Sequence, residues 1–188
     1  EDMATLAGDA LIVEAFSVIA SEMAKIHNPS LILRYAKALD VLAKKTGMQG
    51  MIGGQVVDVQ KTGEKLNEEE LDFIYRLKTG ALLEASFMIG AIVGGAKQEE
   101  IDVMEEIARN IGMAFQIQDD ILDETSTEEE LGKPIHSDER NVKTTYGLNK
   151  AKDEVLRCST EAQRLLDTIQ GDTSVLKKMI VWLSMRRK

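Results

Sequence analysis

The sequence predicts an all-α protein with a single domain spanning residues 1–188. Three observations favour this class: apolar residues recur at spacings of three, four and seven, no segment alternates as β-strands do, and only two prolines occur in 188 residues. Apolar residues make up 44% and charged residues 29% of the chain, which is typical of a globular protein. A chain of this length can bury a substantial core.

The first half of the chain is expected to form five helices, at residues 3–25, 31–46, 48–60, 68–78 and 81–96. Asp2 and Ser30 are side chains typical of N-caps, and Asn67 with Glu70 three residues later forms the pattern of a capping box. Gly47 and the pair Gly94–Gly95 are expected to end the second and fifth of these helices.

The third expected helix contains Gly50, Gly53 and Gly54. Each glycine costs a helix about 1 kcal/mol relative to alanine, so we expect another helix to approach closely here. The fifth, "ALLEASFMIGAIVGGA", is the most apolar stretch of the chain and includes Glu84. It is short for a membrane span, so a buried core helix is predicted and no membrane span is expected.

The second half is expected to contain a long helix at residues 98–123, then a polar loop at 124–141. Two amphipathic helices are predicted to follow, at residues 151–170 and 174–187.

Composition excludes some classes of function. The net charge of −9 argues against nucleic acid as a partner, because binding to phosphate backbones needs a basic surface. The single cysteine, Cys158, excludes an internal disulfide framework and is interpreted as an inert thiol in a reducing compartment. No basic segment followed by an apolar one resembles a signal peptide, so a cytoplasmic location is predicted.

The stretch "FQIQDDILD" places like charges beside apolar residues. Gln116, Asp119, Asp120 and Asp123 follow the spacing i, i+3, i+4 and i+7, so they form one stripe on the long helix. Carboxylates so close together need neutralising when they are partly buried. Mg²⁺ suits such a site, because it takes one or two carboxylates together with phosphate and water oxygens. The alternative from the residues alone is a solvated acidic face. A calcium loop is excluded by Ile121 and Glu124, at its third and sixth positions counted from Asp119.

Three lysines lie in sequence without helical periodicity. Lys78, next to Thr79, opens the most apolar helix, whereas Lys133 and Lys143 lie within and after the polar loop. Together they could converge on a phosphate, although each one alone would normally be a solvated surface charge. A diphosphate bound through metal beside an apolar helix indicates a substrate with a phosphate head and a hydrocarbon tail.

These features resemble the trans-prenyl diphosphate synthases, the family of farnesyl and geranylgeranyl diphosphate synthases. The matching stretches occur in the family's order and are "LAGDAL" (6–11), "GGQ" within 50–59, "RLKTGALLEAS" (76–86), "GMAFQIQDDILD" (112–123), "LGKPIHSDERNVKTTY" (131–146) and the closing "RRK". Tyr75 stands where the family often has histidine. The family usually has several more residues between stretches like "KTTY" and "GLNKAK", so either this loop is short or residues are missing after Tyr146. The resemblance implies a helical bundle of the isoprenoid-synthase kind around a central cavity.

The resemblance also implies roles for individual residues. Asp119, Asp120 and Asp123 would bind Mg²⁺ and, through it, an allylic diphosphate that Lys78, Lys133 and Lys143 would contact. Thr79 and Gln116 would stabilise the developing cation, and Gln55 and Asp58 would line the same cavity.

The implied reaction condenses isopentenyl diphosphate with an allylic diphosphate, with farnesyl diphosphate as the favoured product, in a homodimeric enzyme of isoprenoid biosynthesis. Two alternatives stay open: a non-catalytic subunit or fragment that supplies half a site to a partner chain, and a terpene-cyclase-like diphosphate lyase. The lysine pattern and "GGQ" argue against the lyase.

The family's first aspartate-rich motif and its isopentenyl diphosphate site would precede "EDMATLAGDAL". We therefore expect the N-terminal helices of the fold to be absent from this chain. We also expect residues 1–188 alone to be inactive and to expose an apolar patch around the helix at 81–96.

Overall fold

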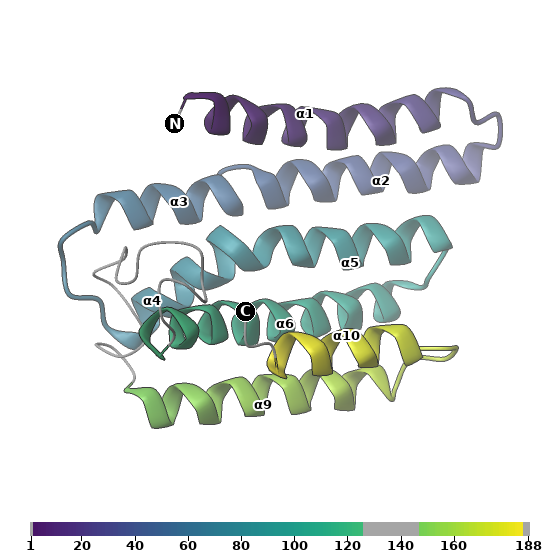
Figure 1. Cartoon of the computed structure of the whole chain (residues 1–188). Helices are drawn as coiled ribbons and strands as arrows, with labels where there is room; N and C mark the ends of the chain where they lie inside the picture. Colours follow the sequence, from purple (N-terminus) through teal and green to yellow (C-terminus); the bar gives the residue numbers. More distant parts are fainter. Residues whose placement is uncertain (1, 126–146, 186–188) are drawn as a thin grey trace.

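The computed structural model describes residues 2–125 and 147–185, and its secondary structure within those ranges is helical. Figure 1 shows rows of helices that lie side by side and alternate in direction, and some of these rows consist of two helices that follow one another in the same direction. The predicted all-α class is thereby confirmed. Lys133 and Lys143 lie outside the described residues, as does most of the expected loop at 124–141.

The N-terminal part forms helices α1 (Asp2–Ala24), α2 (Pro29–Thr46) and α3 (Met51–Gln60). Two predicted caps are wrong. Asp2 lies in the first turn of α1, and α2 is capped by Asn28, whose side chain accepts hydrogen bonds from the backbone N–H groups of Ser30 and Leu31. The cap falls at Asn28 because Pro29, which has no N–H, suits the first helical position. Residues 48–50 form a turn, so α3 begins at Met51.

The next three elements run on without a break: α4 (Glu68–Ile74), a six-residue π-helix η1 (Tyr75–Gly80) and α5 (Ala81–Gly94). The predicted capping box is confirmed by two reciprocal hydrogen bonds between Asn67 and Glu70. The predicted glycine end of α5 is also confirmed, since Gly95 adopts a left-handed conformation with φ of +86°. The π-helix was not predicted.

The C-terminal part contains α6 (Gln98–Thr125), α9 (Leu148–Leu166) and α10 (Ser174–Met185). Helix α9 begins three residues before its predicted start, next to Gly147 with φ of +79°. It ends at Leu166 because the N–H groups of Thr168 and Ile169 bond to carbonyls three residues back, which tightens the chain into turns.

The core lies on both sides of α6, which packs against α5, η1, α9 and α10. One apolar cluster joins α4, η1, α6 and α9, and a second joins α6, α9 and α10. A third cluster, around Ala38, Ile92 and Ile101, holds α2 against α5 and α6.

Two glycines set how closely helices approach near η1. A Cβ on Gly54 would lie 2.4 Å from the backbone nitrogen of Lys78, and one on Gly112 would lie 3.0 Å from the Cα of Gly80. The predicted close approach is confirmed for Gly54. A Cβ on Gly50 would meet the backbone of Lys45 in the last turn of α2, so a helix lies close there as well. The prediction is wrong for Gly53, which faces the backbone of Met48 in the turn that precedes α3.

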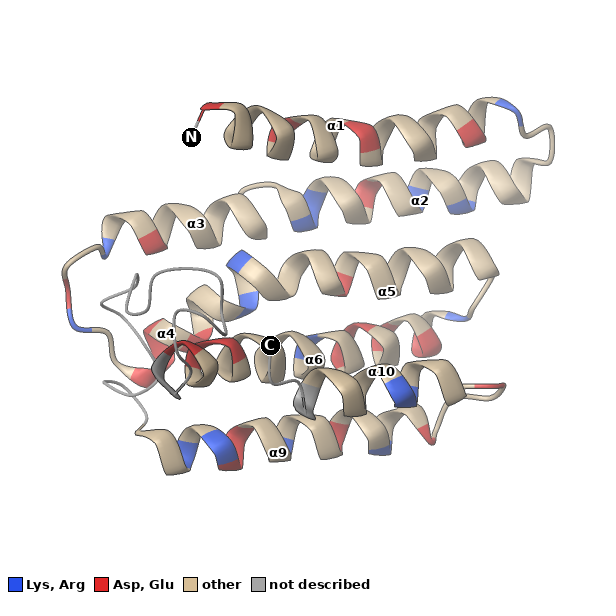
Figure 2. Cartoon of the chain, in the orientation of Figure 1, with Lys and Arg blue, Asp and Glu red and all other residues tan. Residues whose placement is uncertain are grey.

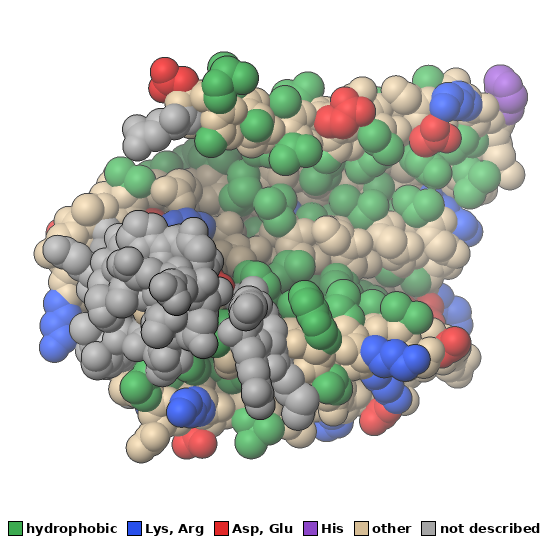
Figure 3. Space-filling model, viewed as in Figure 1, with side chains coloured by type: hydrophobic (Ala, Val, Ile, Leu, Met, Phe, Trp, Pro, Cys, Tyr) green, Lys and Arg blue, Asp and Glu red, His purple; other side chains and the backbone are tan. Residues whose placement is uncertain are grey.

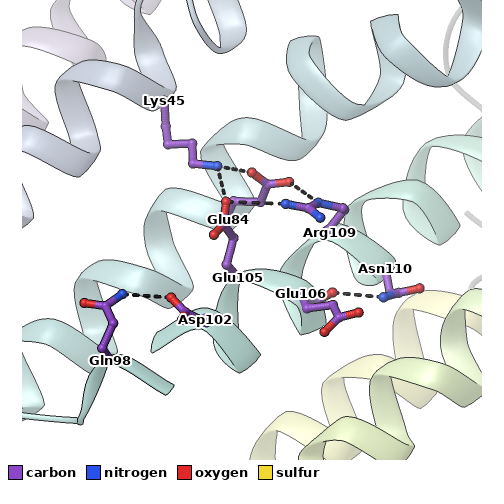
Figure 4. Close-up of polar contacts among 8 residues, drawn as sticks. All are labelled: Lys45, Glu84, Gln98, Asp102, Glu105, Glu106, Arg109 and Asn110. Carbon is purple, nitrogen blue, oxygen red and sulfur yellow. Dashed lines mark hydrogen bonds and ion pairs between the residues drawn. The ribbon is translucent and has the colours of Figure 1, made fainter. Parts of the chain in front are cut away.

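A cluster of four charged side chains, here called the four-charge cluster, ties α2, α5 and α6 together (Figure 4). Glu84, only 2% exposed, accepts from Lys45 and from Arg109, the latter at 3.2 Å. Glu105 lies 2.7 Å from Lys45 and 3.4 Å from Arg109. This pairing explains how the most apolar helix accommodates a buried carboxylate.

Helix α1 packs on α2 and has no buried residue. Figure 3 shows hydrophobic side chains gathered over α1 and α2. The large apolar side chains that α1 leaves exposed are Met3, Leu6, Leu11, Val13 and Val18. The predicted apolar surface therefore lies on α1, and its expected position around α5 is wrong, since α5 carries none of the large exposed apolar side chains among the described residues.

Two helical stretches, Asp2–Ala24 and Glu68–Gly94, are long and apolar enough to cross a membrane by length and composition. The second contributes Leu71, Ile74 and Ile92 to the core. Core helices of water-soluble proteins pass the same test, so the absence of a membrane span stays a prediction.

Candidate active site

A small pocket of about 50 Å³ lies where α3, η1 and α6 meet. Five of the ten site residues expected from the sequence line it: Asp58, Lys78, Thr79, Gln116 and Asp120. Figure 2 shows acidic residues along α6 as far as its end near α4, and basic residues on the helical segment that joins α4 to α5. The pocket lies between these two sets of charges.

The aspartates lie on the last turns of α6 with the predicted helical spacing. Asp119, Asp120 and Asp123 are each half-buried, as is Gln116 one turn earlier. The Gln116 side-chain amide donates to Asp120 Oδ1 at 3.0 Å. The amide therefore holds one oxygen of Asp120 in a defined direction.

The π-helix supplies the other half of this arrangement. The Tyr75 hydroxyl donates to Asp120 Oδ2, and the Thr79 hydroxyl donates to Gln116 Oε1 at 2.8 Å. Three hydrogen bonds therefore link the side chains of Tyr75, Asp120, Gln116 and Thr79 in that order and bridge η1 and α6 at two points. The backbones of the two helical segments complete the loop, and the four residues are here called the Asp120 ring. The sequence prediction named Tyr75 only as a departure from the family, although its position four residues before Thr79 places both on one helical face.

Lys78 points toward α3, where its ammonium lies 2.7 Å from the carboxylate of Asp58. Its side chain is 41% exposed, so the cation stays accessible to a ligand. Lys78 also lines a larger, apolar pocket of about 550 Å³ along α3 with Gln55 and Val56. One lysine thus borders both a polar and an apolar space, as expected for a site that takes a phosphate head and a hydrocarbon tail.

The chemistry of the aspartates fits a divalent cation. No group of three or more His, Cys, Asp or Glu side chains within residues 2–125 and 147–185 converges as a protein-built metal cage. Mg²⁺ does not need such a cage, because it retains waters and takes phosphate oxygens with one or two carboxylates. Adjacent half-buried aspartates beside an accessible lysine meet that requirement.

Known proteins resemble this chain in sequence. The model of the polyprenyl synthetase family matches residues 1–182. The chain is 40% identical over 180 residues to the farnesyl diphosphate synthase of Geobacillus stearothermophilus, covering 94% of this chain and 60% of that protein. It is 43% identical over 180 residues to a heterodimeric geranylgeranyl pyrophosphate synthase large subunit of Arabidopsis thaliana, covering 92% of this chain and 48% of that protein.

Solved structures show the same fold. An FPP/GFPP synthase from Zymomonas mobilis matches 96% of this chain and 60% of its own with a TM-score of 0.78 at 28% identity. A Helicobacter pylori geranyltransferase, complexed with magnesium and isoprenyl diphosphate, matches 97% of this chain and 59% of its own with a TM-score of 0.78 at 30% identity. The expected isoprenoid-synthase-like bundle is confirmed, and the chain spans about half to 60% of the length of these relatives.

Proposed function

Because this chain belongs to the polyprenyl synthetase family, we propose that it carries the allylic half of the active site of a short-chain prenyl diphosphate synthase. The reaction condenses isopentenyl diphosphate with an allylic diphosphate, and we propose farnesyl diphosphate as the product. The observation that carries the proposal is the convergence of Asp58, Lys78, Thr79, Gln116 and Asp120 on one pocket.

The charges have a direct use in this reaction. Asp119, Asp120 and Asp123 would hold Mg²⁺, which when bound neutralises the diphosphate leaving group. Lys78 would contact the same diphosphate, since the negative charge that develops on it as the C–O bond breaks is stabilised by a nearby cation. Asp58, 2.7 Å away, would hold Lys78 in place before ligand arrives. We propose the same contact with diphosphate for Lys133 and Lys143.

The uncharged residues serve the hydrocarbon part of the substrate. Thr79 and Gln116 would face the allylic carbons with oxygen atoms that stabilise positive charge. Gln55 lines the apolar pocket along α3, whose volume of about 550 Å³ suits a short isoprenoid tail. Exclusion of water by apolar walls protects a carbocation from hydrolysis.

Partners and location remain part of the proposal. The exposed apolar side chains of α1 favour a second protein surface over this face, and we propose a homodimer in the cytoplasm. The same exposure favours a second candidate function: a non-catalytic chain that completes its site with a partner. One relative is named as the large subunit of a heterodimeric enzyme, which is consistent with such an arrangement.

Calorimetry tests the proposed ligand. An allylic diphosphate analogue is expected to bind the 188-residue chain with Mg²⁺ and to lose about 100-fold in affinity in excess EDTA or in Asp120→Asn. The metal would link the diphosphate to the aspartates, and even residues that only contact metal ligands change affinity by about 10- to 100-fold. Asp40→Asn, which changes an exposed carboxylate paired with Lys44 on α2, is the matched control. Equal affinity with Mg²⁺ and with EDTA would contradict the proposal.

Turnover separates the candidate functions. Labelled isopentenyl diphosphate and an allylic primer should yield a linear prenyl diphosphate when the complete enzyme acts, and a cyclised product would indicate a lyase. We expect no turnover by the 188-residue chain alone. Prenyl diphosphate formed by a monomeric chain of verified mass, at a rate typical of enzymes, would refute that expectation.

A further inference from the structure

Tyr75 combines a buried ring with a hydroxyl that reaches the aspartate stripe. The residue is only 6% exposed and belongs to the apolar cluster of Leu71, Ile74 and Ile117. Its ring therefore has little freedom to move. Its hydroxyl donates to Asp120 Oδ2, on a different helix and 45 residues further along the chain.

The remaining members of the Asp120 ring fix the other oxygen of the same carboxylate. Thr79 donates to Gln116 Oε1, which orients the amide so that its NH₂ group faces Asp120 Oδ1. Tyr75 and Thr79 lie four residues apart on η1, and Gln116 and Asp120 lie four residues apart on α6. The two helical segments thus hold both oxygens of one aspartate.

We propose that Tyr75 is a positioning residue that fixes the carboxylate of Asp120 for a divalent cation. This inference rests on the proposed function, in which Asp120 is a cation ligand. The donors Tyr75 and Gln116 are uncharged, so these two contacts leave the negative charge of the carboxylate in place. Each carboxylate oxygen can accept about two hydrogen bonds, so one donor on each oxygen does not use the whole accepting capacity of the carboxylate.

A hydrogen bond that holds a metal ligand in its binding rotamer raises metal affinity, whereas apolar packing of the Tyr75 side chain would not. A ligand already held in its binding rotamer loses little side-chain entropy when the cation arrives. A Tyr75 that served only to fill the core would contribute through its ring, which phenylalanine retains. The hydroxyl is therefore the part of Tyr75 whose removal tests the inference.

The test measures Mn²⁺ binding to the 188-residue chain by electron paramagnetic resonance, in the presence of inorganic diphosphate. Tyr75→Phe is expected to weaken Mn²⁺ binding about 10-fold, the lower end of the effect of partners to metal ligands. The thermal unfolding temperature should fall by no more than the loss of one hydrogen bond produces, and a higher Mn²⁺ concentration should restore saturation. Tyr35→Phe, on α2 and away from the pocket, is the matched control and should leave Mn²⁺ affinity as in the wild type.

A second variant tests the Asp120 ring and leaves the buried side chain of Tyr75 unchanged. Thr79→Val should weaken Mn²⁺ binding about fivefold, the equivalent of one ordinary hydrogen bond, because the Gln116 amide loses its orienting partner.

The outcomes are distinct. A wild-type chain that binds no Mn²⁺ with diphosphate would overturn the proposed function and this inference with it. A wild-type chain that binds Mn²⁺, with Tyr75→Phe binding equally well, would overturn the role of Tyr75 alone. An equal loss in Tyr75→Phe and Tyr35→Phe would overturn it as well, because the effect would not depend on the contact with Asp120.

Discussion

The four-charge cluster and the Asp120 ring both join α6 to neighbouring helices through carboxylates, but they use different partners. In the cluster, Glu84 and Glu105 face the cations of Lys45 and Arg109, so the charges balance within the protein. In the ring, Asp120 accepts from the neutral donors Tyr75 and Gln116. The carboxylates and cations of the four-charge cluster therefore neutralise one another, whereas the hydrogen bonds of the Asp120 ring orient a carboxylate without cancelling its charge.

The difference separates a structural use of charge from a binding use. Two carboxylates and two cations inside a helix bundle need no further ligand, and their role is to fix the helices relative to one another. A carboxylate held by neutral donors keeps its attraction for a cation. Both arrangements lie on α6, with Arg109 and Gln116 seven residues, or two turns, apart.

The largest expected effect comes from breaking the balance of the four-charge cluster. Lys45→Met removes a cation whose side chain is 19% exposed and leaves Glu84 and Glu105 to share Arg109. We expect the free energy of unfolding to fall by about 3 kcal/mol, because an uncompensated carboxylate stays buried. Urea unfolding followed by circular dichroism measures this loss.

The adjacent lysine provides the control. Lys44 pairs with Asp40 on the surface of α2, where its side chain is 61% exposed, so Lys44→Met should cost at most about 1 kcal/mol. If Lys45→Met and Lys44→Met lose the same free energy of unfolding, the four-charge cluster does not stabilise the packing of α2, α5 and α6 as proposed.

A smaller effect is expected where the site depends on close backbone packing. Gly54→Ala places a Cβ 2.4 Å from the Lys78 nitrogen, so α3 must move away from η1. We expect a loss of about 2 kcal/mol in unfolding free energy, typical of overpacking, together with weaker diphosphate binding. The four-charge cluster should keep its contribution, because none of its members lies on α3 or η1.

Gly90→Ala on α5 is the control for that substitution. A Cβ at this position would meet no heavy atom within 4 Å beyond its chain neighbours and the backbone of its own helix, so alanine should raise stability by up to about 1 kcal/mol. A destabilised Gly90→Ala, or a Gly54→Ala chain as stable as the wild type, would contradict the packing described for α3 and η1.

The last prediction involves no loss of stability and concerns the reactivity of a thiol in the core next to the Asp120 ring. Cys158 is 1% exposed and packs in the same apolar cluster as Tyr75, and burial raises the pKa of its thiol to about 12. The thiolate fraction near pH 7 is therefore very small, and the thiol should react with a disulfide reagent only when the core opens. The native labelling rate should be far below the rate in urea, and comparable rates would show that this core opens readily.

Much of the architecture could be read from the sequence. The apolar periodicity, the capping box at Asn67 and the glycine end of α5 specify helices through interactions between residues close in the chain. Errors arose where two local signals compete. Asn28 rather than Ser30 caps α2 because Pro29 occupies the first helical position, and α9 ends at Leu166 where the backbone turns into shorter-range hydrogen bonds.

For the candidate site, the aspartate stripe follows from the sequence alone, because residues at i, i+3, i+4 and i+7 share one face of any α-helix. The sequence also identified Lys78, Thr79, Gln55 and Asp58 by their motifs, without placing them relative to one another. The packing of the helices brings Lys78 to Asp58, Tyr75 to Asp120, and Glu84 to Lys45 and Arg109. Those contacts join residues 20 to 45 positions apart, and they depend on how helices pack, which local spacing does not specify.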